Sequence, residues 1–155
     1  MTNRLGPIAE PFPSDIALAL AAYPQQNGYI LSLFRTFANS VRFLKKGVPN
    51  LLDRESPLSL RTREIVILRV TANKNCEYEW GVHVSIFAAA AKISQTQIEA
   101  TRSGPVDPNL WSEPEVSLLK VIDSLCAIGT IEDGLIEQFE SDWTKEQQLE
   151  IFALC

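Results

Sequence analysis

The chain has 155 residues, and 14 Lys and Arg against 19 Asp and Glu give it a formal net charge of −5 at pH 7. A compact chain of this length buries about 70% of its unfolded surface, so one domain over residues 1–155 is expected without disulfide or metal staples. The hydrophobic content of 46% is typical of globular proteins, and the acidic balance argues against a nucleic-acid partner, which would need clustered Lys and Arg.

Apolar residues recur at three- and four-residue spacing along nearly the whole chain, which predicts an all-α fold. A first helix is expected over residues 14–22, with Ser14 as its N-cap. A second is expected over residues 28–46, where the apolar positions form one broad face. Gly47 and Pro49 supply its stop signal.

The third and fourth predicted helices are separated by a short polar turn. The third is expected to begin at Pro57 or Ser59 and to run through Thr71. Residues 72–75 contain two asparagines and predict a tight turn. The fourth helix follows over residues 77–91 and ends in a run of alanines, whose small side chains would let another helix approach closely.

Two capping boxes mark further helix starts. Ser94 with Gln97 predicts a short helix, and Ser112 with Glu115 predicts a strongly amphipathic one. The amphipathic helix is expected to end near Gly129, because glycine commonly follows the last helical turn.

The last two helices are expected over residues 131–139 and from Thr144 through Leu154. The apolar periodicity of the final helix is still running at Cys155. Either the end of that helix is packed, or the sequence is a truncated version of a longer protein.

Cysteine usage and the N-terminal residues indicate where the protein resides. Cys76, Cys126 and Cys155 are odd in number and widely spaced, unlike a secreted disulfide framework. Residues 1–13 lack the apolar run of a signal peptide, and no apolar stretch approaches the ~20 residues that span a bilayer. We therefore expect a cytoplasmic protein without a membrane partner.

Three side chains of chemical interest share one face of the predicted fourth helix. Cys76, Glu79 and His83 lie at spacings of 0, 3 and 7, which places them within roughly 60° of one another around the helix axis. Cys76 stands at the helix start, where the dipole favours a thiolate. Glu77 and Glu79 oppose this effect, because each negative charge raises the pKa of a thiol.

Other residues could complete a site around these three. If the third and fourth helices form an antiparallel hairpin, Glu64 lies about three turns down the partner helix and would face His83, which lies about two turns along its own helix. Tyr78 and Trp80 would either wall the site from water or fill the core.

Structural roles would also explain the same residues. A lone Cys is commonly a small buried hydrophobe, a lone His commonly packs in a core, and Glu64 has arginines close by in sequence for a salt bridge. Metal binding by Cys76, Glu79 and His83 is geometrically feasible, but these ligands are few, and we expect no metal.

The stretch over residues 60–98, LRTREIVILRVTANKNCEYEWGVHVSIFAAAAKISQTQI, resembles the core of the carboxymuconolactone decarboxylase family, which includes alkylhydroperoxidase D-like proteins. Their motif is Glu, eleven residues, Cys, two residues, Cys, three residues, His. Glu64, Cys76 and His83 match it, whereas Glu79 replaces the second cysteine. With a motif core over 58–100, the resemblance implies an all-helical bundle, a homo-oligomer (trimer or hexamer) and no cofactor.

Three functions are compatible with this resemblance. The first is a thiol-dependent, peroxidase-like oxidoreductase in which Cys76 attacks the peroxide, Glu64 and His83 relay protons, and Glu79 acts as base or orienting group. Because Glu79 cannot resolve an oxidised thiol, resolution would need Cys126, Cys155, another subunit or a small thiol.

The second is a decarboxylase or related lyase acting on a small carboxylic acid or lactone, with Glu64, Glu79 and His83 as acid–base groups. Its substrate carboxylate would call for an arginine, and the sequence does not rank the candidates Arg35, Arg42, Arg61, Arg63 and Arg69. The third is a non-catalytic helical oligomer that has lost the family chemistry with the second cysteine.

Overall fold

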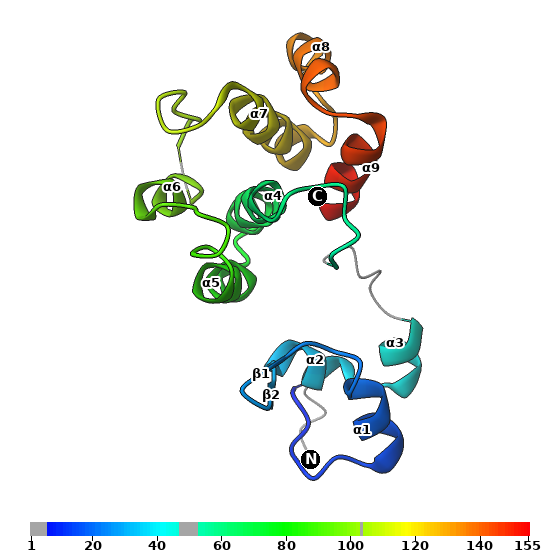
Figure 1. Cartoon of the computed structure of the whole chain (residues 1–155). Coiled ribbons are helices and arrows are strands. Elements are labelled where there is room, and N and C mark those ends of the chain that lie inside the picture. The colour runs from blue at the N-terminus through cyan, green and yellow to red at the C-terminus, as the bar shows by residue number, and fades with distance from the viewer. Residues whose placement is uncertain (1–5, 47–52, 103) are drawn as a thin grey trace. The chain divides into compact units, whose positions relative to one another are not determined.

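The computed structural model describes residues 6–46, 53–102 and 104–155. The chain divides into two compact units, residues 1–50 and 51–155 (Figure 1). Within the described residues the regular elements are helices apart from one two-stranded hairpin, which confirms the all-α fold. The single domain expected over residues 1–155 stays a prediction.

The first unit is built from short elements around a small core. Its buried apolar residues are Leu20, Ile30, Ala38 and Leu44. Its elements are α1 (Ser14–Leu20), β1 (Gln25–Gln26), β2 (Tyr29–Ile30), α2 (Ser32–Phe37) and α3 (Val41–Lys46). Helix α1 is close to prediction, although Pro13 rather than Ser14 is its N-cap.

The prediction of one helix over residues 28–46 was wrong. Asn27 and Gly28 both have positive φ, which is the backbone of a two-residue hairpin turn, so the chain pairs β1 with β2 there. A second break follows at Asn39 and Ser40, whose side chains bond backbone groups of Thr36 and Phe43 in competition with a continuous helix. The predicted stop at Gly47 and Pro49 lies outside the described residues.

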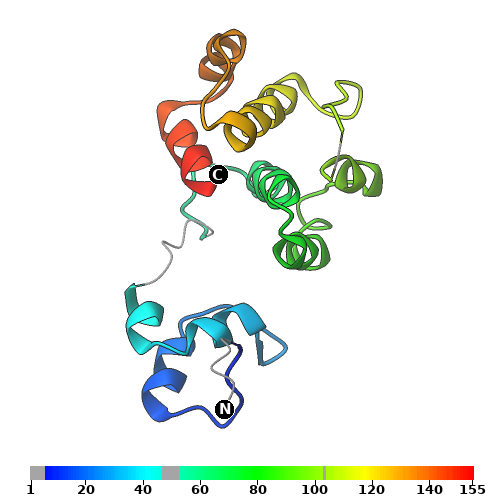
Figure 2. The same cartoon turned by 180° about the vertical axis from the view of Figure 1, so that it is seen from behind.

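The second unit is a helical bundle around one central helix (Figures 1 and 2). Its core is formed chiefly by aliphatic side chains of α4 and α7, joined by Trp111, Phe139 and Ile151. The elements are α4 (Leu60–Asn73), α5 (Glu77–Ile86), α6 (Gln95–Ala100), α7 (Glu113–Ile128), α8 (Asp133–Asp142) and α9 (Lys145–Leu154). Helix α4 contacts α5, α7 and α9.

Most helix starts of this unit follow the predicted caps. The Ser59 hydroxyl accepts a hydrogen bond from the third residue of α4, and capping boxes at Ser94, Ser112 and Thr144 begin α6, α7 and α9. Helix α7 ends at Gly129 in the left-handed conformation. Because caps are local interactions, they could be predicted from sequence.

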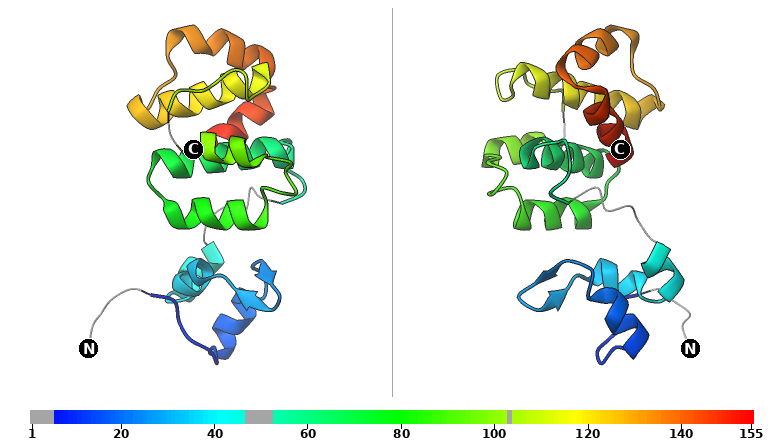
Figure 3. Two further views of the ribbon diagram at one scale, coloured as in Figure 1. Left: turned by 90° about the vertical axis from the view of Figure 1, so that its left-hand side faces the viewer. Right: turned by 45° about the vertical axis from the view of Figure 1, so that its right-hand side comes forward.

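The α4–α5 hairpin forms as expected, with two boundary corrections (Figure 3). Helix α4 runs to Asn73, and the chain reverses at Asn75, which has a positive φ. Helix α5 ends at Ile86 rather than at residue 91. The alanine run turns instead, with positive φ at Lys92, so that Ala88 and Ala91 enter the core.

Helix α8 begins two residues later than predicted and extends to Asp142. The backbone N–H of Glu132 donates to the Ser124 hydroxyl, which also donates to the Thr130 carbonyl. These two bonds tie residues 130–132 to α7 and delay the helix start.

Candidate functional site

A buried carboxylate–imidazole pair lies between α4 and α5. The Nδ1–H of His83 donates to Oε2 of Glu64 across 2.7 Å. Their side chains are 8% and 2% exposed, and the ring of Phe87 lies beside the imidazole. The bond fixes the ring orientation and leaves Nε2 as the nitrogen available for proton exchange. The predicted approach of Glu64 to His83 is confirmed.

Cys76 is the N-cap of α5 and is exposed. Its backbone N–H donates to the carbonyl of Thr71 at 2.8 Å, which anchors the helix start to the end of α4. Its thiol makes no capping hydrogen bond. The thiol is therefore presented to solvent at the positive end of a ten-residue helix, where an anion is favoured.

Beside Cys76 lies an open pocket of about 180 Å³. Its wall combines the end of α4, the start of α5 and the residue that follows the cap of α6: Thr71, Ala72, Asn75, Cys76, Glu77, Trp80 and Arg102. A free thiol and a guanidinium group therefore line the same small space.

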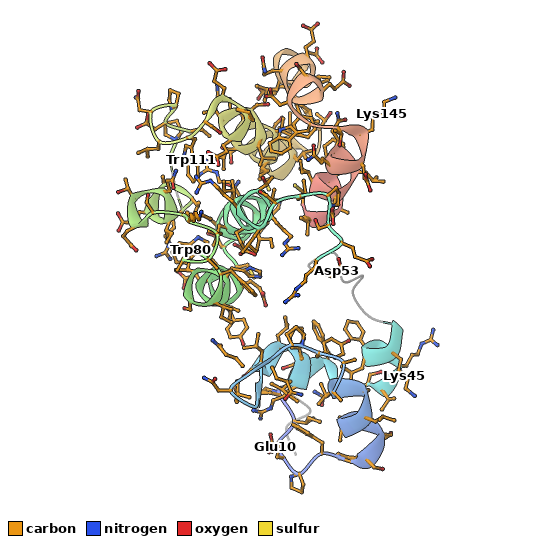
Figure 4. All side chains as sticks on the ribbon, viewed as in Figure 1. Glu10, Lys45, Asp53, Trp80, Trp111 and Lys145 are labelled. Atoms are coloured by element: carbon orange, nitrogen blue, oxygen red, sulfur yellow. The ribbon has the colours of Figure 1, made fainter. Side chains whose placement is uncertain are left out.

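Arg102 is held at this pocket by an aromatic ring and a carboxylate. Its guanidinium carbon lies 4.4 Å from the centre of the Trp80 ring, in cation–π geometry. Its Nη2 lies 3.2 Å from Oε1 of Glu77, and both side chains are largely exposed. The Trp80 ring is fixed in turn, because its Nε1–H donates to the buried hydroxyl of Thr101. Figure 4 labels Trp80 on α5.

A buried arginine holds the segment that carries Arg102. Arg69, on α4, is 5% exposed and donates two 2.6 Å hydrogen bonds to the carboxylate of Asp123 on α7. Its remaining N–H groups donate to the carbonyls of Ala100, Thr101 and Gly104. The end of α6 is therefore pinned to α4 and α7 on both sides of Arg102.

The structure separates the predicted site residues into two groups. Glu64 and His83 are joined in the buried pair, while Cys76 and Trp80 line the pocket. Glu79 is partly buried and lies one helical turn before His83 on α5. Tyr78 is 50% exposed and is not among the residues that line the pocket.

Four of the five arginines proposed from sequence have other structural partners. Arg61 pairs with Glu115, Arg69 pairs with Asp123, and Arg63 donates to the Asp53 carbonyl. Arg35 belongs to the first unit, where it donates to the Ile8 carbonyl, and Arg42 is exposed on α3.

Sequence analysis missed Arg102, Thr71 and Asn75. Arg102 lies 26 positions after Cys76, on another helix end, so no local spacing connects it with the thiol. Thr71 and Asn75 frame the predicted turn, but nothing in their pattern indicated a pocket.

The other two cysteines lie away from the pocket. Cys126 on α7 is partly buried, and Cys155, although exposed as a residue, carries a thiol whose pKa is raised to about 12 by burial and by the neighbouring Cys126 thiol. Within the described ranges, no group of three His, Cys, Asp or Glu residues is placed to hold a metal ion. No helix in the described part of the chain is long and apolar enough to cross a membrane.

The fold and site define a class of all-α proteins in which a central helical hairpin carries a buried Glu–His pair and an exposed thiol at the start of its second helix. The sequence profile of the carboxymuconolactone decarboxylase family matches residues 44–119, about half of the chain. The chain belongs to this family. Comparisons with curated proteins and with solved structures gave no match.

Proposed function

We propose that this protein is a thiol-dependent, peroxidase-like oxidoreductase that uses Cys76. The observation that supports this most is the exposed thiol at the start of α5, in a pocket that also contains Arg102. A helix N-terminus and a nearby guanidinium both stabilise a thiolate, which is the nucleophile that peroxides oxidise. Glu77 and Glu79 act against this stabilisation.

In the proposed reaction the Cys76 thiolate attacks one peroxide oxygen. A sulfur–oxygen bond forms, the O–O bond breaks, and the other oxygen leaves with the electron pair as an alkoxide or hydroxide. Cys76 becomes a sulfenic acid, and the leaving oxygen takes up one proton. A thiol then condenses with the sulfenic acid, and a second thiol releases Cys76 as the reduced form.

His83 supplies the proton in this proposal, and Glu64 orients it. The 2.7 Å bond occupies Nδ1 and leaves Nε2 for proton transfer, and the carboxylate stabilises the imidazolium between transfers. Glu79 lies one turn from His83 toward Cys76 and is the group through which protons would pass along the helix.

Trapping the sulfenic acid tests this function. We expect dimedone, added with a modest excess of hydrogen peroxide, to modify Cys76, as read by mass spectrometry of the digested protein. Cys76→Ser should abolish the adduct, and Cys126→Ser is the matched control that should leave it unchanged. An unmodified Cys76 under these conditions would refute the proposal.

A second candidate function, a lyase acting on a small carboxylic acid or lactone, is favoured by the burial of the Glu64–His83 pair. A buried, oriented imidazole is suited to general acid–base catalysis without any thiol. If Cys76→Ser retains turnover of such an acid and His83→Gln loses it, the lyase replaces the peroxidase.

The homo-oligomer implied by the family resemblance is also a proposal. The second unit leaves Ile128, Leu149 and Phe152 exposed by 40% or more, and burying such side chains against another copy would stabilise an assembly. Sedimentation velocity of the purified chain tests this, and a monomer at micromolar concentration would contradict it.

A further inference from the structure

We propose that the Cys76 pocket binds a small thiol that carries a carboxylate, and that Arg102 selects this thiol for the resolution of oxidised Cys76. This inference deepens the proposed function and rests on it. It assigns a specificity role to Arg102 and a chemical class to the reductant.

The position of the cysteines indicates that the reductant comes from outside the chain. Glu79 stands where a second thiol would resolve the sulfenic acid. Cys126 and Cys155, both described by the structure, do not line the pocket, and burial of the Cys155 thiol disfavours its thiolate. The pocket, in contrast, opens to solvent beside the exposed Cys76.

Two charged side chains line the pocket, Arg102 and Glu77, and the weak pairing between them leaves Arg102 able to bind an anionic group. The Arg102 side chain is 52% exposed, so part of its guanidinium surface is free to meet a carboxylate, which is the group whose geometry it matches. Its present partner, Glu77, is 85% exposed, and such surface ion pairs contribute little and exchange readily. The N–H groups at the start of α5 add partial positive charge.

The pocket is also held in shape. Trp80 provides a flat apolar wall beneath Arg102 and is fixed by its hydrogen bond to Thr101. Arg69 holds the carbonyls on either side of Arg102. A volume of about 180 Å³ suits a molecule of only a few non-hydrogen atoms, or the thiol end of a longer one.

The reduction of oxidised Cys76 needs no reactant other than two molecules of the small thiol. The thiol condenses with the Cys76 sulfenic acid, forming an S–S bond and releasing water. A second molecule of the same thiol attacks the mixed disulfide, and the products are reduced Cys76 and the disulfide of the small thiol. The two electrons passed to the peroxide are thus supplied by two thiols.

Alkylation with two nearly isosteric reagents tests the pocket without peroxide. Iodoacetate is an anion and iodoacetamide is neutral, and the rate at Cys76 is followed by mass spectrometry of its peptide. We expect the iodoacetate-to-iodoacetamide rate ratio in the folded protein to exceed the ratio in the urea-unfolded protein by about threefold or more at low salt. Arg102→Gln should remove this excess, and Glu77→Gln should increase it.

Arg54→Gln is the matched control, because Arg54 is an exposed arginine outside the pocket and the substitution removes the same charge. Arg102→Lys should retain part of the preference. A folded-state ratio no higher than the unfolded one, or a ratio that Arg102→Gln leaves unchanged, would overturn the assignment of Arg102.

A second measurement separates this inference from the proposed function. After peroxide treatment, mercaptopropionate should form the mixed disulfide at Cys76 faster than neutral mercaptoethanol, and Arg102→Gln should equalise the two rates. Equal rates in the unmodified chain would refute the thiol class while leaving the peroxidase in place. Failure of peroxide to oxidise Cys76, with the alkylation preference intact, would refute the peroxidase and its resolution step and leave only the anion-binding pocket.

Discussion

The Glu64–His83 pair gives the most demanding prediction, because both partners are buried and neither can turn to water. A hydrogen bond with a charged partner contributes about 1.5–3 kcal/mol net, and the 2.7 Å separation places this bond at the strong end. Glu64→Gln keeps an oxygen acceptor for Nδ1–H and should lower the free energy of unfolding by about 1–2 kcal/mol. His83→Gln leaves a carboxylate that is 2% exposed without its partner, which should cost about 3–5 kcal/mol.

A double-mutant cycle isolates the interaction from these separate costs. In the chain with both substitutions, position 64 no longer carries a carboxylate that lacks its partner, so the combined loss should be smaller than the sum of the single losses by about 1.5 kcal/mol or more. Urea unfolding followed by tryptophan fluorescence is a suitable assay, because Trp80, Trp111 and Trp143 all belong to residues 51–155 and report that unit alone. Losses that add to within about 0.5 kcal/mol would show that the pair is not energetically coupled.

The same substitutions separate stability from catalysis. If His83 delivers the proton, His83→Gln should slow oxidation of Cys76 by peroxide about a hundredfold at a temperature where the variant is still folded. Glu64→Gln, which retains a hydrogen-bond acceptor for the ring, should slow it less. An unchanged rate in His83→Gln would exclude the relay.

Three further predictions concern the surroundings of the site. Burial acts to raise the pKa of Glu115, but hydrogen bonds from Arg61 and from the backbone, with the charge of Arg61, hold that pKa below 4.5. Ionised Glu115 therefore stabilises the fold above pH 4.5, and this contribution is lost as the pH falls through the lowered pKa. In urea unfolding, Glu115→Gln should reduce the loss of stability on going to acid pH. Arg69→Met should lower the free energy of unfolding by about 3–5 kcal/mol in the same assay, and Arg69→Lys should recover only part of the loss, since lysine cannot make the two-fold carboxylate bond. Because its pKa is about 12, Cys155 should react with iodoacetamide at pH 7 about a hundredfold more slowly than Cys76, by mass spectrometry of the two peptides.

Local signals carried most of the successful predictions. The starts of α4, α6, α7 and α9 follow from side-chain caps that lie within three residues of the groups they satisfy. The asparagine-containing turn predicted the α4–α5 hairpin, and the hairpin alone brings Glu64 to His83. Asn27–Gly28 is also a strong local signal, for a hairpin turn, but the apolar periodicity of the following residues favoured a helix over residues 28–46 instead.

The pocket could not be predicted, because Arg102 is brought to it by packing between segments that are distant in the sequence. Arg102 lies beside Cys76 because Arg69 holds the end of α6 against α4 and because Trp80, which packs on Arg102, is hydrogen-bonded to Thr101. Neither contact leaves a periodic trace in the sequence. The sequence offered arginines close to the motif as ligands for a substrate carboxylate, but Arg61 and Arg69 form salt bridges with Glu115 and Asp123.

The two parts of the site lie about two turns apart along α5, and this arrangement determines how the two functions can be separated. The thiol stands at the solvent-facing start of the helix, and the imidazole is buried farther along, so a peroxidase requires both parts in one reaction, whereas a lyase requires only the second. In a peroxidase, Cys76→Ser and His83→Gln act on the same step, and their combined effect should be no larger than that of Cys76→Ser alone. In a lyase, Cys76→Ser should leave turnover unchanged, both alone and combined with His83→Gln. Comparing the two single variants with the double variant, on a peroxide or acid that the protein turns over, therefore distinguishes the two mechanisms.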